Sequence, residues 1–177
     1  MLTTERLLLR DFSEGDWPSV HEYASDPEVV RYTDWGPNTE QQTKDFIALM
    51  QSLRGQAPRT EYAFAVILKA QNRLIGTCGL SIEKPQHREG ALGYCYSRRF
   101  WGQGYATEAA AATLANGFAQ LDLHRIYATC DVLNVRSWRV MEKIGMRRET
   151  HLREHLWQKD RWRDSFVYGM LSSEWKP

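Results

Sequence analysis

Residues 98–109 constrain the fold of this chain more than any other stretch. They lead from a strand-like segment through the turn Gly102-Gln103-Gly104 into an alanine-rich segment, residues 105–121, which contains no proline and predicts a long helix. Glycine lets the backbone turn so that successive N–H groups point outward, and the helix N-terminus adds unpaired donors and the positive end of its dipole. A strand–turn–helix unit of this kind can cradle a phosphate or a diphosphate.

The spacing within this turn excludes two common nucleotide-binding motifs. Thr107 occupies the third glycine position of a Rossmann GxGxxG, and no Gly-Lys-Ser/Thr follows as it does in a Walker A loop. Two glycines before a helix also occur where a helix only needs a tight turn, and taken alone this explanation is the commoner one. The turn by itself therefore leaves the bound group open.

Residue patterns on either side of this unit predict the remaining elements. Before the turn, the expected strands are residues 4–12, 61–69, 74–83 and 90–97, and the expected helices are 13–25 and one that begins near Thr39. After it, we expect a strand at 125–130, a helix at 137–144 that ends at Gly145, and a closing hairpin of 146–157 with 162–171.

This order of elements predicts an α+β fold of mixed α/β layers around one central, mostly antiparallel sheet. The crossover through the helix that begins at Tyr105 is the connection expected to join two parallel neighbours. With 177 residues and no linker or low-complexity segment, residues 1–177 are expected to form a single domain.

Charge and hydropathy argue against two classes of partner. The formal net charge is +1, and basic residues near the C-terminus such as Arg153 and Arg163 alternate with Glu154 and Asp164, so no nucleic-acid partner is expected. No stretch approaches the roughly 18 apolar residues of a membrane span, and residues 1–10 lack the apolar run of a signal peptide. We therefore expect no membrane partner and a cytoplasmic location.

No metal site is expected either. The three cysteines form no CxxC pair, and Cys130 in a short apolar segment is expected to be a buried core thiol rather than a nucleophile. His151 and His155 are four residues apart, but they fall in a strand-like segment where that spacing does not bring ligands together.

Several motifs resemble the GNAT superfamily of acetyltransferases. The run Arg99-Phe100-Trp101-Gly102-Gln103-Gly104 matches the family pattern Arg/Gln-x-x-Gly-x-Gly/Ala in the expected strand–turn–helix position. The chain also resembles the RimJ/RimL branch, whose named members acetylate the N-termini of ribosomal proteins. The residues that carry this resemblance are Gly93-Tyr94, residues 100–109, Asn134-x-x-Ser137 and Glu142-Lys143-Ile144-Gly145-Met146. The resemblance extends from Leu7-Leu8-Leu9-Arg10 to Tyr168 and Glu174-Trp175.

The resemblance implies a GNAT-like fold, in which the central strands of a twisted sheet splay apart and about four helices flank the sheet. It implies an N-acetyltransferase that uses acetyl-coenzyme A (acetyl-CoA) as cosubstrate and acts by direct attack of a primary amine on the thioester. The branch implies a protein N-terminal α-amine as acceptor. The alternatives are a small-molecule amine, such as a polyamine or an aminoglycoside, and a non-catalytic CoA-binding sensor. Monomer and homodimer are both open.

The same resemblance implies which residues hold the coenzyme. Backbone amides of residues 100–106 would hold the diphosphate, and the strand around Tyr94 would pair with the pantetheine arm as an extra strand does. Gly93 is expected near a bulge beside the splayed strands, where an N–H could polarise the acetyl carbonyl. The expected coenzyme-binding residues are Tyr94, Cys95, Tyr96, Arg99, Phe100, Gly102, Gln103, Gly104, Tyr105, Ala106, Asn134 and Ser137.

Ser137 and Glu89 are the two residues expected to take part in the chemistry. Asn134 and Ser137 lie where a helix begins, and both residue types are favoured there as caps. The resemblance favours Asn134 as a hydrogen-bond partner of pantetheine and Ser137 as a catalytic donor to the leaving sulfur. Glu89, just before the strand from Gly90, is the candidate catalytic base, with an exposed loop glutamate and proton transfer through water as the alternatives.

Three further residues have an expected role near the site. Tyr32 and Trp35 lie in the loop that covers the acceptor in the family, although aromatic residues there could equally anchor the loop on the sheet. Glu108, near the start of the alanine-rich helix, is expected to stabilise that helix through the attraction between its negative charge and the positive end of the helix dipole.

Overall fold

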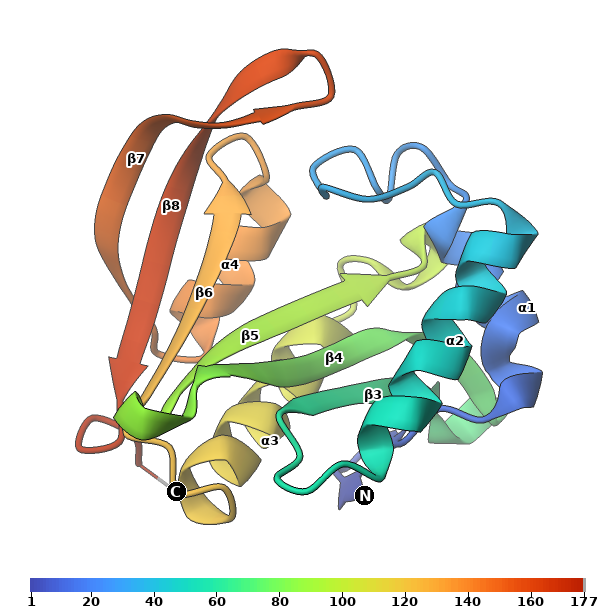
Figure 1. Ribbon diagram of the computed structural model, residues 1–177, viewed down its shortest axis with the longest axis horizontal. Helices are drawn as coiled ribbons and strands as arrows, with labels where there is room; N and C mark the ends of the chain where they lie inside the picture. The colour runs from blue at the N-terminus through green and yellow to red at the C-terminus, as the bar shows by residue number, and fades with distance from the viewer. Residues whose placement is uncertain (177) are drawn as a thin grey trace.

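An eight-stranded sheet runs through the whole structure, a computed structural model that describes residues 1–176 (Figure 1). The strand order is β1-β2-β3-β4-β5-β6-β8-β7, and every neighbouring pair is antiparallel except β5 and β6. The strands are β1 (Leu2–Thr3), β2 (Leu7–Arg10), β3 (Glu61–Leu68), β4 (Arg73–Lys84), β5 (Glu89–Tyr96), β6 (Arg125–Asp131), β7 (Arg147–Gln158) and β8 (Arg161–Leu171).

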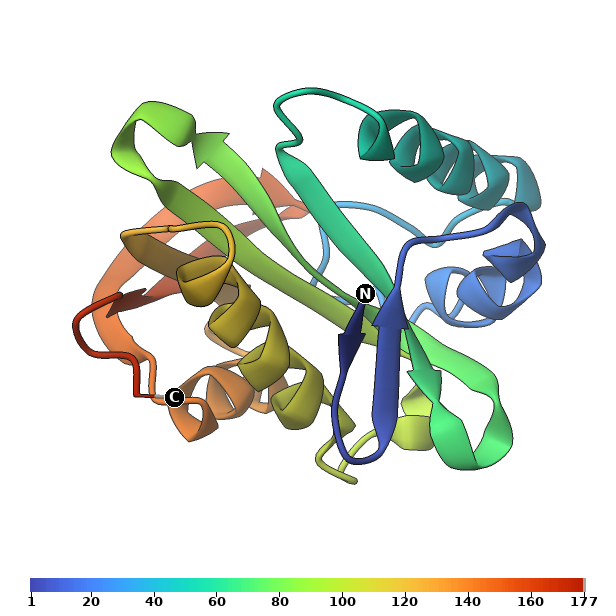
Figure 2. The same cartoon turned by 90° about the horizontal axis from the view of Figure 1, so that it is seen from below.

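Four α-helices cover the two faces of this sheet (Figure 2). Helices α1 (Trp17–Ala24) and α2 (Glu40–Arg54) pack on one face, and α3 (Tyr105–Ala119) and α4 (Val135–Lys143) pack on the other. We call these the α1/α2 face and the α3/α4 face. The α+β class, the central sheet and the four flanking helices are therefore as the sequence predicts.

Residues of β3 show how the sequence builds both faces. Phe64, Val66 and Leu68 belong to the buried cluster on the α3/α4 face, while Ala65 and Ile67 between them belong to the cluster under α1 and α2. Successive side chains of a strand point to opposite faces, so a nearly continuous apolar run marks a strand that is covered on both sides.

The crossover prediction is confirmed. Strand β5 continues through α3 into β6, and β5 and β6 pair in parallel. This unit places the turn between β5 and α3 at the carboxyl end of β5, where α/β folds commonly bind ligands.

Two details differ from the predicted elements, and a third, the strand of the closing hairpin that pairs with β6, was not predicted. Of the predicted strand 4–12 only residues 7–10 form a strand, β2, and it pairs with β1 at residues 2–3, because Thr4 N–H donates to Leu7 O at 3.0 Å and the chain reverses there. Helix α4 begins at Val135, two residues earlier than predicted, because Asn134 caps it. The closing hairpin is folded so that β8, not β7, pairs with β6. None of the helices within residues 1–176 has both the length and the apolar character needed to cross a bilayer.

Gly79 in β4 is a site where the packing of the sheet can be tested. A Cβ built at Gly79 would lie 2.4 Å from Tyr62 O and 2.7 Å from Ala63 Cα, both backbone atoms of β3. We expect Gly79→Ala to lower the free energy of unfolding by about 1–3 kcal/mol, because the two central strands must separate to admit a methyl group. Urea unfolding followed by circular dichroism measures this. Gly55→Ala is the control, because a Cβ there meets nothing within 4 Å; equal stability of the two variants would contradict the prediction.

Candidate active site

Strands β5 and β6 are paired at only one end. The pairs are Glu89 with Arg125, Gly90 with Ile126 and Ala91 with Tyr127, and no further pair joins these strands in the described residues. Beyond Ala91 the two strands diverge (Figure 1). We call this divergence, between residues 92–96 of β5 and 128–131 of β6, the splay. It confirms the splayed central strands that the family resemblance implies.

Backbone groups of β5 face the splay. Ser97 N–H donates to Ile75 O on the β4 side at 3.0 Å, and in an antiparallel ladder alternate residues turn their backbone groups to opposite sides. Leu92, Tyr94 and Tyr96 therefore turn theirs toward the splay. Tyr96 O already accepts a hydrogen bond from Trp101 Nε1 at 2.8 Å. The edge offered by Leu92 and Tyr94 fits an extended chain that carries amide groups, as the pantetheine arm does.

The turn that follows β5 presents a row of free amides. Gly102 and Gly104 have φ angles of +74° and +82°, values that side-chain-bearing residues rarely adopt. A Cβ at Gly102 would meet nothing within 4 Å, so conformation rather than crowding requires glycine there. Within residues 1–176, none of the N–H groups of residues 102–107 donates a hydrogen bond. Six unpartnered donors at the start of α3 fit a diphosphate.

Glu108 fastens this turn to the N-terminal hairpin. Its carboxylate accepts hydrogen bonds from Thr4 Oγ1 at 2.5 Å, Arg6 N–H at 2.9 Å and Arg6 Nε at 2.6 Å. Arg6 Nη1 also donates to Gln103 O at 3.0 Å. Partial burial alone would raise the pKa of Glu108, but these hydrogen bonds outweigh it and lower the pKa. Glu108 therefore does more than favour the helix dipole, because it holds the amide row in place.

Ser137 and Tyr94 meet across the splay. Tyr94, from β5, donates through its hydroxyl to Ser137 O at 2.8 Å, and the same hydroxyl lies 3.2 Å from Ser137 Oγ, at the start of α4. Burial raises the pKa of Tyr94 above its ordinary value, so its hydroxyl stays protonated at neutral pH. The sequence analysis named Tyr94 as a coenzyme-binding residue but missed its contact with Ser137, because this partner lies 43 positions away in the chain.

Asn134 acts as a helix cap. Its Oδ1 accepts a hydrogen bond from Ser137 N–H at 3.2 Å, the arrangement expected of an N-cap. Between α4 and the amide row, the Arg136 guanidinium lies 4.7 Å from the centre of the Trp101 ring. Residues 134–137 are thus brought close to the turn that carries the free amides.

Cys95 is placed differently from its expected role. It pairs with Thr77 of β4, and its side chain packs in the cluster under α1 and α2. Burial raises the pKa of its thiol to about 12. Because its backbone groups point to β4 and its side chain points away from α3 and α4, Cys95 does not present a group to the splay.

Glu89 lies at the closed end of the splay. It pairs with Arg125 in the ladder, and its carboxylate lies 3.1 Å from Lys84 Nζ and 3.5 Å from Arg125 Nη1. Gly93 is four residues further along β5, about 13 Å away along an extended strand. The structure therefore does not bring Glu89 to the splay, because the start of β5 is the part that β6 still holds.

Gly93 sits in a regular part of the ladder. It pairs with Gly79, whereas the register between β4 and β5 shifts between Ser81 and Lys84, opposite Gly90. The bulge expected near Gly93 thus lies about three residues earlier. Gly93 is exposed and a Cβ there would meet nothing within 4 Å, so the space beside it is open.

A bridge between two loops lies beyond the diverging strands (Figure 1). At the tip of the β7–β8 hairpin, Gln158 Nε2 donates to Thr33 O at 2.6 Å, and Lys159 Nζ donates to Trp35 O at 3.2 Å and to Val30 O. We call residues 30–35 with Gln158 and Lys159 the arch. Tyr32 and Trp35, expected over the acceptor, belong to it, and Trp35 is 38% exposed.

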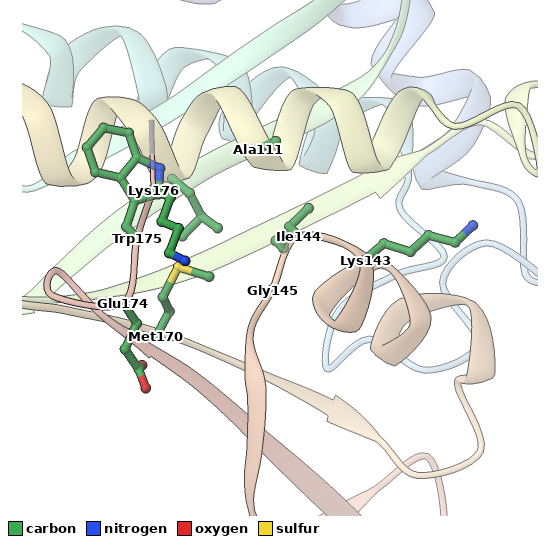
Figure 3. Close-up of a pocket in the computed structure, with 9 residues that line it drawn as sticks. Ala111, Lys143, Ile144, Gly145, Met170, Glu174, Trp175 and Lys176 are labelled. Atoms are coloured by element: carbon green, nitrogen blue, oxygen red, sulfur yellow. The ribbon is translucent and has the colours of Figure 1, made fainter.

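A separate pocket of about 440 Å³ lies where the C-terminal segment crosses α3 and the end of α4 (Figure 3). Ala111, Gly145, Met170 and Trp175 are among its lining residues. It lies against the middle of α3 rather than its first turn, so it is distinct from the amide row.

Comparisons with known proteins agree with this geometry. The family model described as "Acetyltransferase (GNAT) domain" matches residues 6–147. The chain is 38% identical to the uncharacterized N-acetyltransferase YnaD of Bacillus subtilis, over 98% of both chains. It is 22% identical to the ribosomal protein uS5 alanine N-acetyltransferase of Escherichia coli, over 99% of this chain and 93% of that one. The solved spermidine N-acetyltransferase of Vibrio cholerae, in complex with CoA and spermine, superimposes with a TM-score of 0.84 at 24% identity, over 97% and 98% of the two chains.

The amide row can be tested at Gly104. We expect Gly104→Ala to weaken the affinity for coenzyme A at least about fivefold. An alanine held at this positive φ loses about 1–2 kcal/mol, and relief of that strain would rotate the free amides away. Isothermal titration calorimetry measures the affinity. Gly145→Ala is the matched control, since Gly145 has a φ of +87° at the end of α4 and carries the same strain away from the row. Equal affinities in the two variants would count against the row as the diphosphate site.

Proposed function

Because the chain belongs to the GNAT acetyltransferase family, we propose that it transfers the acetyl group of acetyl-CoA to the α-amine of a protein N-terminus, with residues 1–177 acting as one domain. Family membership establishes an N-acetyltransferase that uses acetyl-CoA. The observation that carries the proposal is the unpaired edge of β5, which leads directly into the six free amides of residues 102–107. The N-terminal acceptor is supported by the similarity to the E. coli enzyme named for a ribosomal protein alanine.

The amide row and the free edge of β5 would bind different parts of the cosubstrate. The amides of residues 102–107 would hold the diphosphate, and the edge at Leu92 and Tyr94 would pair with the amides of the pantetheine arm. Arg99 and Phe100 begin this turn, and Gln103 Nε2 braces it by donating to Arg99 O at 3.1 Å. Tyr105 and Ala106 open α3, so their contribution is their backbone N–H groups.

The reaction needs little from the protein beyond position and a proton donor. The amine nitrogen forms a bond to the thioester carbon, the carbon–sulfur bond breaks, and its electron pair leaves with sulfur. The amine loses a proton to water, and the thiolate gains one. Holding both reactants in line contributes up to about 7–11 kcal/mol in the most favourable intramolecular reactions. An acid or base in position adds about 10²- to 10⁴-fold.

We assign the proton donor to the hydroxyl pair of Ser137 and Tyr94. Both hydroxyls sit beside the β5 edge that would hold the arm ending in the thioester. Because burial raises the pKa of Tyr94, its role is to donate a hydrogen bond and orient Ser137 rather than to ionise. The ion pairs of Glu89 with Lys84 and Arg125 favour a structural role for this carboxylate and leave water as the base.

A small-molecule amine is the second candidate acceptor. The V. cholerae neighbour is named for spermidine and shares the fold with this chain, and the arch that would cover an acceptor carries both charged and aromatic side chains. A third possibility is a CoA-binding sensor without turnover. These possibilities differ in which amine, if any, releases free CoA.

An acceptor screen tests the proposal directly. With acetyl-CoA, we expect short peptides with a free α-amine to release thiol faster than spermidine or an aminoglycoside, measured with a thiol reagent and confirmed by the peptide mass. A set of the same peptides with a blocked N-terminus is the control. Faster turnover of spermidine would support the small-molecule acceptor, and binding of acetyl-CoA without thiol release above hydrolysis would support the sensor.

The donor pair is tested by removing each hydroxyl. We expect Ser137→Ala to lower kcat about 10²-fold and Tyr94→Phe to lower it by less, with CoA affinity nearly unchanged, because neither hydroxyl is needed to hold the diphosphate. Glu89→Gln serves as the comparison and should leave kcat almost unchanged. An equal loss of kcat and CoA affinity in Ser137→Ala would mark Ser137 as a cap only, and a large loss in Glu89→Gln would restore Glu89 as the base.

A further inference from the structure

Arg163 is a buried cation that has no partner of opposite charge among residues 1–176. It lies on β8 with a relative exposure of 7%, and it forms no ion pair with any carboxylate of residues 1–176. Its Nη1 donates to Gln158 Oε1 at 2.9 Å, but its buried Nε has no hydrogen-bond partner. A guanidinium cannot shed its proton at physiological pH, so the charge stays and its burial is costly unless an anion approaches.

Two carboxylates near Arg163 in the ladder and in the sequence, those of Asp131 and Asp164, have other partners. Asp131, which is fully buried, pairs with Arg161 and accepts from Leu133 N–H at 2.9 Å. Asp164 accepts from Glu154 N–H at 2.9 Å and lies 2.8 Å from His151 Nε2. The Cys130 thiol supplies no negative charge, because burial raises its pKa to about 12 against the opposing effect of Arg163.

The register places Arg163 on the face of the sheet opposite the amide row. Ser165 pairs with Asp131, so Ser165, Asp131 and, two residues along β8, Arg163 share one face of the sheet. The parallel pair of Ala91 with Tyr127 puts Gly93 on that same face, which is the α1/α2 face. The α3/α4 face, by contrast, carries the amide row.

Arg163 also reaches the arch. It binds Gln158 Oε1, and the amide nitrogen of the same Gln158 donates to Thr33 O at 2.6 Å. The free Nε of Arg163 is therefore held beneath the loop that would cover an acceptor, by a chain of two hydrogen bonds.

We propose that Arg163 binds a carboxylate of the acceptor and so selects amines that carry an anionic group close to the reacting nitrogen. This inference rests on the proposed transferase function and narrows its acceptor class. Bidentate recognition of carboxylates is the chemistry for which a guanidinium is suited. A nearby positive charge also lowers the pKa of an ammonium group, which favours the neutral amine that attacks the thioester. A polyamine, which offers only cations, gains nothing from this site.

Matched acceptors test the proposal. One pair is alanine and alaninamide, which probes the α-carboxylate of a free amino acid; the other is Ala-Asp-amide and Ala-Asn-amide, which probes an acidic second residue of a peptide. We expect the wild-type protein to prefer the anionic member of at least one pair by about tenfold or more in kcat/KM. Which pair shows the preference identifies the source of the carboxylate.

The variants separate recognition from folding. Arg163→Gln should raise KM for the preferred anionic acceptor by about tenfold or more and change KM for its neutral match much less, while Arg163→Lys should restore part of the difference. Arg153→Gln, which removes an exposed charge of the same hairpin, is the control and should change neither. Calorimetry with coenzyme A checks that each variant keeps its cosubstrate site.

A binding measurement keeps the proposal testable if turnover is slow. The acetylated products of both matched pairs are titrated into the CoA-loaded protein, and the anionic product of at least one pair is expected to bind more tightly in the wild type but not in Arg163→Gln. Equal affinity for the two products within both pairs, or an equal loss for both members of a pair in Arg163→Gln, would overturn the role of Arg163. Absence of any thiol release with intact CoA binding would instead overturn the proposed function.

Discussion

The early end of the β5–β6 pairing is the constraint on which the rest of the structure depends. A strand in the middle of a sheet normally satisfies backbone groups on both sides, and unpaired polar groups of the backbone must find water or a ligand. Here residues 76–84 of β4 pair with residues 89–96 of β5 and satisfy the backbone groups on one side of β5. On the other side, the pairing with β6 ends at Ala91. Trp101 covers only the last carbonyl, that of Tyr96. The free edge therefore carries backbone groups of β5 that an extended ligand with its own amide groups can pair with.

Three sets of contacts keep this opening in a defined shape. On one side, Glu108 ties the start of α3 to Thr4 and Arg6, so the amide row cannot move independently of the N-terminal hairpin. On the other, the buried Asp131 at the end of β6 is held by Arg161 of β8. Arg161 is 39% exposed and the pair lies four residues beyond Tyr127, the last residue of β6 that pairs with β5, so this contact holds the free end of β6 rather than the point of divergence. The arch joins the two sides at the open end.

Local patterns made most of the fold and the glycine turn before α3 predictable. Glycines 102 and 104, the proline-free helix behind them and the apolar strands each depend on neighbours in the sequence, and the structure has them close to the predicted positions except for the N-terminal strand. What escaped prediction depends on distant partners. Strand β8 lies between β6 and β7, the hydroxyl of Tyr94 meets Ser137, and the buried Nε of Arg163 has no partner in residues 1–176. Glu89 was expected near the chemistry because it precedes the predicted strand from Gly90, but it is the first residue of β5, and β5 and β6 diverge at the other end.

The proposed sites on the two faces of the splay rely on different kinds of positive charge. This difference would explain why a diphosphate site can be predicted from the sequence whereas the acceptor cannot. On the α3/α4 face the donors are backbone N–H groups, which need only two glycines at positive φ and a helix, and such a site accepts the same diphosphate whatever the side chains. On the α1/α2 face the charge is one guanidinium whose surroundings come from β6, β8 and the arch. Changing a single residue of the arch or of β8 would alter which amine fits, without disturbing the amide row. Relatives that share this fold and cosubstrate can therefore differ in acceptor, as the ribosomal-protein and spermidine enzymes do by name.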